Sequence, residues 1–236
     1  MSFPEVFAAG VQIHQRKNTC ENQNGFCPDW IVNNFGDRYV DPLFRHLELV
    51  VIAVVAGFVI AFALGVVAHR RRWLVGPIVG VTGILYTIPS VAAFLLLIPI
   101  TGFGLLTAVI ALTAYTLLII FRNVISGLAA APEEARDAAR GMGLTENQVL
   151  WKVEIPLALP EIFAGVRIAT TTSVGLAALA FFAGAGGLGG LIFGDLVFKS
   201  NVVVAGGLCI IMAFVLDGLL LIAQRLSTPW VRAARA

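Results

Sequence analysis

The stretch EEARDAARGMGLTENQVLWKVEIPLALPEI, residues 133–162, is charged and punctuated by glycine and proline, whereas the chain on either side of it is almost entirely apolar. Pro132 and the two glutamates after it are typical of a first helical turn, because carboxylates are favoured near the positive end of the helix dipole. Gly141 and Gly143 offer places for this helix to end. The stretch therefore predicts a short helix inside a polar loop.

A second short helix is predicted to begin at Thr145. The Thr145 hydroxyl can accept a hydrogen bond from the amide of Gln148, and the Gln148 side chain can reach back, which makes a capping box. Pro156 and Pro160 are expected to end this helical run. A helix this short is marginal alone in water, so it needs support from a partner or from neighbouring helix ends. We therefore expect residues 127–161 to form two short helices joined by a glycine hinge.

The composition of the whole chain is that of an integral membrane protein. Of its 236 residues, 58% are hydrophobic and only 13% are charged, and the mean hydropathy is +0.90. Soluble domains are roughly half apolar and a quarter charged. A membrane-spanning helix needs about 20 apolar residues. Five windows qualify and predict an all-α protein with five transmembrane helices: residues 47–68, 76–99, 104–125, 162–183 and 202–223.

The basic residues orient these spans. They follow the first span, surround the gap between the third and fourth, and follow the fifth, so an odd number of spans brings all three groups to one side. The positive-inside rule makes that side the cytoplasm, with the N-terminus outside and the C-terminus inside. The groups are Arg70, Arg71 and Arg72; Arg122, Arg136, Arg140, Lys152 and Arg167; and Arg225, Arg232 and Arg235.

Residues 1–45 are expected outside the membrane and residues 46–236 form the membrane domain. Within the outer segment, residues 1–27 are polar and loop-like, with no role that the sequence assigns. Residues 28–45 show apolar and aromatic residues at helical spacing, which favours an amphipathic helix on the outer membrane surface; an irregular lead-in to the first span is the alternative. An outside location would also allow a disulfide between Cys20 and Cys27.

Enzyme motifs are not found. The chain has no HExxH, GxSxG or CxxC motif, and GDLVFKS, residues 194–200, lacks the second glycine of a phosphate-binding loop. We therefore predict no catalytic residue, no metal site and no cofactor bound by this chain. Asp217 is an ionisable residue inside the fifth span and so a candidate for the transport pathway; a hydrogen bond to a neighbouring helix or to a water is the alternative.

The spacing inside the polar loop resembles the EAA loop of ABC-importer permeases, which reads Glu-Ala-Ala, three residues, Gly, nine residues, Ile-x-Leu-Pro. The residues at the matching positions are Asp137, Ala138, Ala139, Gly143, Val153, Ile155 and Pro156. Aspartate for glutamate, valine for isoleucine and isoleucine for leucine are the departures. The resemblance implies a type I importer permease fold. It also implies that this loop is a coupling helix in the groove of a cytoplasmic ATPase.

Three further segments, YTIPSVAAFLLLIPITGFG, LWKVEIPLALPEIFAGVRIA and AGAGGLGGLIFGDL, are similar to permeases for glycine betaine, carnitine and choline. This resemblance implies a multi-pass permease of the bacterial inner membrane that takes up an osmoprotectant. The implied partners are a second permease chain, identical or homologous, an ATPase dimer that holds ATP and magnesium, and an extracytoplasmic binding protein.

An aromatic face favours a quaternary ammonium, so Tyr86 is the candidate pathway residue, with Thr87, Pro89 and Ser90 beside it. Pro89 is expected to kink its span. Tyr86 would otherwise serve only in packing. An amino-acid permease, or an ATP-independent secondary transporter that uses an intramembrane ionisable residue, is the alternative function.

Overall fold

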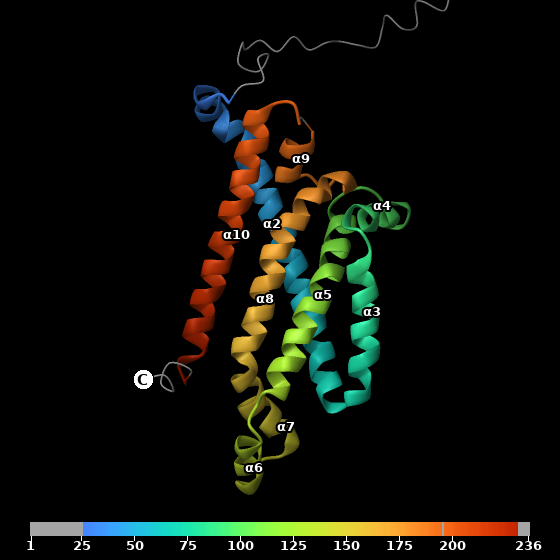
Figure 1. Ribbon diagram of the computed structural model, residues 1–236, viewed down its shortest axis with the longest axis vertical. Helices are drawn as coiled ribbons and strands as arrows, with labels where there is room; N and C mark the ends of the chain where they lie inside the picture. Colours follow the sequence, from blue (N-terminus) through green and yellow to red (C-terminus); the bar gives the residue numbers. More distant parts are fainter. Residues whose placement is uncertain (1–25, 195, 231–236) are drawn as a thin grey trace, which may run out of the picture.

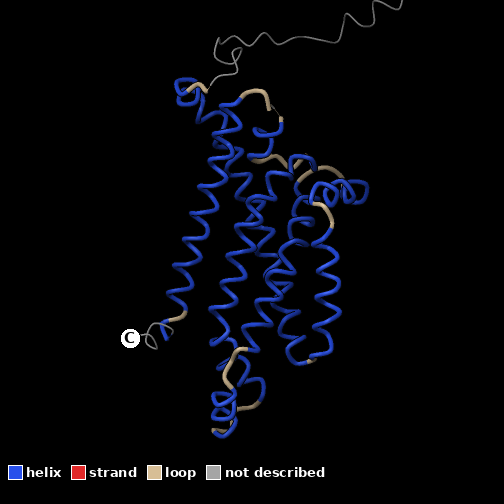
Figure 2. The backbone as a smooth tube through the Cα atoms, viewed as in Figure 1, coloured by secondary structure: helices blue, strands red, loops and turns tan. Residues whose placement is uncertain are grey.

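The computed structural model describes residues 26–194 and 196–230, and in these ranges all regular secondary structure is helical (Figure 1). The turns lie at the two ends of the bundle and at one sharp bend (Figure 2). The helices in chain order are α2 (Pro28–Arg70), η1 (Arg72–Leu74), α3 (Val75–Thr87), α4 (Ser90–Thr101), α5 (Leu105–Ala129), α6 (Glu133–Gly141), α7 (Glu146–Val149), η2 (Leu150–Glu154), α8 (Ile155–Ala177), η3 (Ala178–Ala183), α9 (Leu188–Phe193) and α10 (Lys199–Ser227).

Four helical stretches among the described residues are long and apolar enough to cross a membrane, and a bent pair would make a fifth. The four are α2, α5, the run Glu146–Ala183 and α10, and the bent pair is Arg72–Thr87 with Ser90–Thr101. The five predicted spans are therefore present.

The second span is broken rather than straight. Its two halves, α3 and α4, meet at 97°, and α4 lies across the end of the bundle (Figure 1). Ile88 at the break has φ −62° and ψ 128°, because the ring of Pro89 disfavours the helical conformation of the residue before it. The kink expected at Pro89 is confirmed, and it is a complete break between two helices.

The helix predicted over residues 28–45 is present, but it is not a separate element. It continues without a break into the first span as the 43-residue helix α2. Pro42 lies inside α2 without ending it, and residues 45–47 contain no glycine or proline, so the helix continues into the span. Cys20 lies outside the described residues, and the Cys20–Cys27 disulfide therefore stays a prediction.

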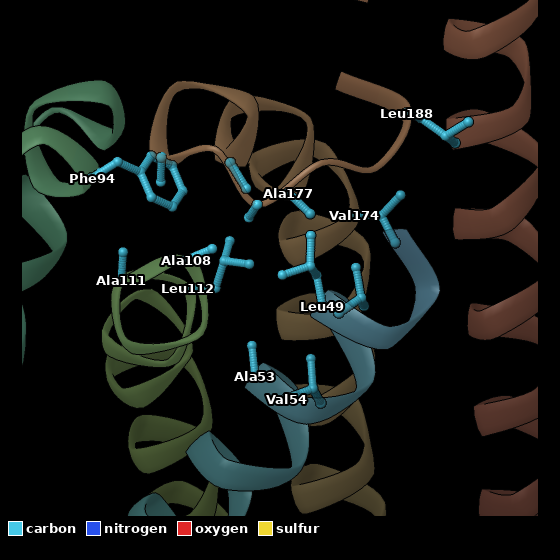
Figure 3. Close-up of a cluster of buried hydrophobic side chains, with 14 of the residues drawn as sticks. Leu49, Ala53, Val54, Phe94, Ala108, Ala111, Leu112, Val174, Ala177 and Leu188 are labelled. Carbon is cyan, nitrogen blue, oxygen red and sulfur yellow. The ribbon is translucent and has the colours of Figure 1, made fainter. Parts of the chain in front are cut away.

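The core forms where α2, α5 and α8 pack together. Leu49 and Val54 of α2 point towards Leu112 of α5 and towards Val174 of α8 (Figure 3). Small residues recur at every fourth position on α2 and let α5 approach closely, as is common between membrane helices. They are Ala53, Gly57, Ala61 and Gly65. A β-carbon added at Gly57 would lie 1.8 Å from the hydroxyl oxygen of Thr116.

The outer end of α2 is fixed to the last part of the chain by buried polar contacts. The Tyr39 hydroxyl donates to Asn201 Oδ1 at 2.8 Å. His46 is fully buried, and its Nδ1 accepts the amide hydrogen of Leu188 at 3.3 Å. Its Nε2 then carries the proton that bonds the Val174 carbonyl at 2.9 Å. These contacts join α2 to α8, α9 and α10 at this end.

The opposite end carries the described members of the three basic groups with one exception, and Arg232 and Arg235 lie outside the described residues. The α2–α3 turn, the loop with α6 and α7, and the end of α10 lie at the same end of the bundle (Figure 1). The exception is Arg167, which the sequence analysis grouped with the basic residues between the third and fourth spans. It lies 12 residues after Ile155 in α8 (167 − 155), or about 18 Å along the helix, so it is not a residue of the loop.

Candidate functional site

The polar loop between α5 and α8 contains the two predicted short helices. Helix α6 follows Pro132 and has Glu133 and Glu134 in its first turn. It ends in a Schellman motif, in which the Leu144 amide donates to the Ala139 carbonyl at 3.1 Å and the Gly143 amide donates to the Arg140 carbonyl at 2.9 Å. Gly143 has a φ of +84°, a conformation that glycine adopts without strain. The predicted glycine hinge is thus a defined helix cap.

Helix α7 begins with the predicted capping box. The Gln148 amide donates to the Thr145 hydroxyl, and the Thr145 amide donates to Gln148 Oε1 at 2.8 Å. Arg140 of α6 then bridges to Glu146 of α7, with Nε 2.9 Å from Oε1. The hydrogen bond and the charge of Arg140 hold the pKa of the Glu146 carboxyl below its ordinary value. The two short helices therefore form one unit with a fixed hinge.

The prolines after α7 do not end the helical run, contrary to the expectation from the sequence. Helix α7 continues through the π-turn η2 directly into α8, and Pro156 and Pro160 both lie within α8. A proline ring in a regular helix collides with the carbonyl four residues earlier, which for Pro156 is that of Lys152. The π-turn widens the backbone over Leu150–Glu154 and accommodates the ring. The loop and the fourth span are consequently one continuous body.

Of the seven residues at the matching EAA positions, three are exposed, two are buried, and Val153 and Pro156 are half-buried. Asp137, Ala138 and Gly143 are exposed on the far side of the loop, whereas Ala139 and Ile155 are buried within the chain. Asp137 also has a partner in its own helix, since Arg140 Nη1 lies 3.2 Å from its Oδ1. The exposed set is available to a partner protein, and the buried set anchors the loop.

A buried carboxylate that sequence reasoning missed lies at the base of the loop. Glu154, the last residue of η2, is 7% exposed. Its Oε2 lies 3.0 Å from His69 Nε2, and its Oε1 lies 2.7 Å from Arg136 Nε. Arg136 also donates from Nη2 to the Leu128 carbonyl at 2.7 Å. The sequence shows a glutamate between Val153 and Ile155, the matching positions of the EAA pattern, but it gives no sign of the partners of this glutamate.

The candidate pathway residues lie at the α3–α4 break. Tyr86 is 40% exposed and packs edge-on against Tyr115 of α5, with ring centroids 5.9 Å apart. The Tyr115 hydroxyl donates to the carbonyl of Ile88 at the break. Thr87 bonds the Ile84 carbonyl of its own helix at 2.8 Å, and Ser90 begins α4. Two aromatic rings and the carboxyl-terminal end of α3 thus meet at one place.

Asp217 is not part of this cluster. It lies in α10, on the other side of α5 and α8 from α3 (Figure 1). Arg167 of α8 holds it with two parallel hydrogen bonds, Nε to Oδ1 and Nη2 to Oδ2, both 2.8 Å. Asp217 therefore makes the hydrogen bond to a neighbouring helix that the sequence analysis gave as the alternative to a role in the transport pathway. As a neutralised pair, Asp217 lends little support to an ion-coupled transporter.

The comparisons with known proteins agree with this architecture. Residues 47–233 match the family described as binding-protein-dependent transport system inner membrane component. The chain is 43% identical over 193 residues to the osmoprotectant import permease protein OsmW of Salmonella typhimurium, covering 79% of this chain and 90% of that protein. It is 37% identical over 196 residues to the choline transport system permease protein OpuBB of Bacillus subtilis, with 82% and 90% covered.

A solved structure of the MetNI methionine ABC transporter in inward-facing conformations contains a chain with the same fold. It matches with a TM-score of 0.70 and 26% identity, covering 80% of this chain and 95% of that one. Together with the family match, this likeness confirms the type I importer permease fold. The chain belongs to the family of inner membrane components of binding-protein-dependent transport systems. It is thus a multi-pass transport subunit of the inner membrane.

Proposed function

We propose that this chain is the permease subunit of an ATP-driven importer for an osmoprotectant with a quaternary ammonium group, of the glycine betaine, choline or carnitine kind. The names of its relatives OsmW and OpuBB support this substrate class. The chain itself binds no cofactor in this proposal, and ATP with magnesium is held by a cytoplasmic ATPase dimer. A second permease chain and an extracytoplasmic binding protein complete the importer.

The polar loop of residues 127–161, called the coupling loop from here on, supports the proposed contact with an ATPase. Its exposed side presents Asp137, Ala138 and Gly143, two of them without a bulky side chain, so a partner can approach the backbone of α6. Its other side continues into α8 through η2. A push on α6 and α7 would therefore reach the fourth span without passing through a flexible linker.

The break in the second span supports a cationic substrate. Aromatic faces attract quaternary ammonium groups, and a helix carboxyl end carries partial negative charge from its unpaired carbonyls. The exposed ring of Tyr86 and the end of α3 supply the two features, and the buried Tyr115 packs against the Tyr86 ring. Discontinuous helices of this kind commonly form solute sites in transporters. We propose Tyr86, Thr87, Pro89 and Ser90 as part of the pathway, and assign Asp217 to helix pairing instead.

Reconstitution tests this function. The purified chain with its cognate ATPase and binding protein in liposomes should take up choline, glycine betaine or carnitine only when ATP is present. Uptake without ATP would contradict the importer, and uptake of methionine in place of all three amines would contradict the substrate class. The latter outcome would favour the amino-acid alternative, which the likeness to the methionine transporter keeps open.

A pair of variants tests the aromatic site. Tyr86→Phe keeps the ring and should transport like the wild type, whereas Tyr86→Ala removes it. A cation–π contact contributes roughly 0.5–2 kcal/mol, so we expect Tyr86→Ala to raise the half-saturating amine concentration by about 2- to 30-fold. Equal transport by the two variants would remove Tyr86 from the pathway.

A further inference from the structure

Glu154 occupies the point where the coupling loop meets three spans. It ends the π-turn η2 and precedes α8. Its carboxylate lies between His69 Nε2 at 3.0 Å and Arg136 Nε at 2.7 Å. The side chain of Glu154 is only 10% exposed, that of His69 17% and that of Arg136 16%. Charged contacts withdrawn from water to this degree are screened much less than surface pairs.

The partners of Glu154 come from separate elements. His69 lies in the last turn of α2, and Arg136 lies in α6. Arg136 in turn donates to the carbonyl of Leu128 in the last turn of α5 at 2.7 Å. One carboxylate therefore links the loop to α2 directly and to α5 through a single further residue, while the backbone links it to α8.

A second contact runs beside this link. Arg70, the last residue of α2, donates to the side-chain oxygen of Asn147 in α7. Both short helices of the loop are thus attached to the end of α2, α6 through Glu154 and α7 through Asn147. Neither attachment involves the exposed residues Asp137, Ala138 or Gly143.

We propose that Glu154 is the positioning residue that makes the coupling loop move as one body with α2 and α5 as well as with α8. This inference rests on the proposed function, because it concerns how the push of the ATPase spreads. Without the Glu154 contacts the loop would still be continuous with α8, but its polar contact with the end of α2 would be reduced to the bond between Arg70 and Asn147. Glu154 therefore transmits motion and does not touch the substrate.

The experiment uses the complete importer in liposomes and compares Glu154→Ala and Glu154→Gln with Glu161→Gln, an exposed glutamate of α8. Glu154→Ala removes both the hydrogen bond to His69 and the ion pair with Arg136, so transport per ATP hydrolysed should fall at least about tenfold. Glu154→Gln loses the charge but keeps an acceptor for His69, so its loss should be smaller than that of Glu154→Ala. Co-purification with the ATPase should be retained, since its contact surface is unchanged. Wild-type transport in the Glu154 variants would overturn the proposal, and so would an equal loss in Glu161→Gln.

A cycle with His69 separates transmission from simple damage to the fold. His69→Ala should lose as much coupling as Glu154→Ala, and the double variant should lose no more than either, within about twofold. His69→Gln keeps a hydrogen-bond donor and should recover much of the coupling. Additive losses in the double variant would show that the two residues do not act together and would overturn the proposal.

A distance measurement adds a readout that does not depend on activity. Spin labels at two exposed positions, Arg71 after α2 and Met142 in the loop, should give one narrow distance distribution in the wild-type complex. Glu154→Ala should broaden it, and Glu161→Gln should not. An unchanged distribution in Glu154→Ala would contradict the link. Failure of the wild-type complex to use ATP at all would instead contradict the proposed function.

Discussion

The pair between Arg167 and Asp217 gives a prediction whose magnitude follows from the geometry. The two residues join α8 to α10 through two 2.8 Å hydrogen bonds, and their side chains are 28% and 30% exposed. Asp217→Leu removes both bonds and leaves the guanidinium of Arg167 unpaired in a membrane-spanning helix. An unpaired arginine at the centre of a span costs about 2.5–3.5 kcal/mol on insertion scales. We expect Asp217→Leu to destabilise the protein by about 3 kcal/mol.

The double variant Arg167→Leu with Asp217→Leu provides the control. Replacing an ion pair that is withdrawn from water by apolar side chains is often neutral or stabilising, and this pair is only partly exposed. The double variant should therefore unfold within about 1 kcal/mol of the wild type. The assay is reversible unfolding of the purified chain in mixed micelles, followed by circular dichroism. If Asp217→Leu loses little stability, or if the double variant is less stable than Asp217→Leu, the pair does not stabilise the packing of α10 on α8.

Two further predictions concern glycines with matched controls. Gly57→Ala should destabilise the fold by about 1–3 kcal/mol, because its β-carbon would lie 1.8 Å from Thr116 Oγ1. Gly83→Ala has nothing within 4 Å of the new atom and should be neutral or stabilising. Unfolding in mixed micelles measures both variants, and equal stabilities would contradict the close packing of α2 on α5. Gly143→Val should abolish the substrate-stimulated ATPase activity of the reconstituted complex, because a β-branched residue is strained at φ +84°. The control Gly141→Ala should retain this activity. Normal stimulation in Gly143→Val would contradict the role of the hinge.

Features set by local sequence were predictable. The number of spans followed from the lengths of the apolar runs, the kink followed from Pro89, and the capping box followed from Thr145 and Gln148 three residues apart. The effect of Pro156 was predicted wrongly, because the rule that prolines end helices assumes a regular α-helix and the chain forms a π-turn there. The unbroken length of α2 had a visible signal, the absence of a terminator at residues 45–47.

The long-range contacts that hold the site together could not be predicted from the sequence. Glu154 and His69 are 85 residues apart, and Arg167 and Asp217 are 50 apart. No local pattern pairs such positions, because only the packing of α2 and α10 against α8 brings them together. For the same reason, Asp217 looked like an isolated ionisable group in a span, and Arg167 was counted with the cytoplasmic loop.

Photo-crosslinking from Met142 tests the central claim most directly. Met142 is 74% exposed at the turn between α6 and α7, so Met142→benzoylphenylalanine places a reactive group at the proposed contact with little effect on folding. In cells that express the whole importer, illumination should join this chain to the ATPase subunit. Crosslinking to the extracytoplasmic binding protein instead, or labelling of position 142 by a membrane-impermeant reagent added outside the cell, would contradict the account.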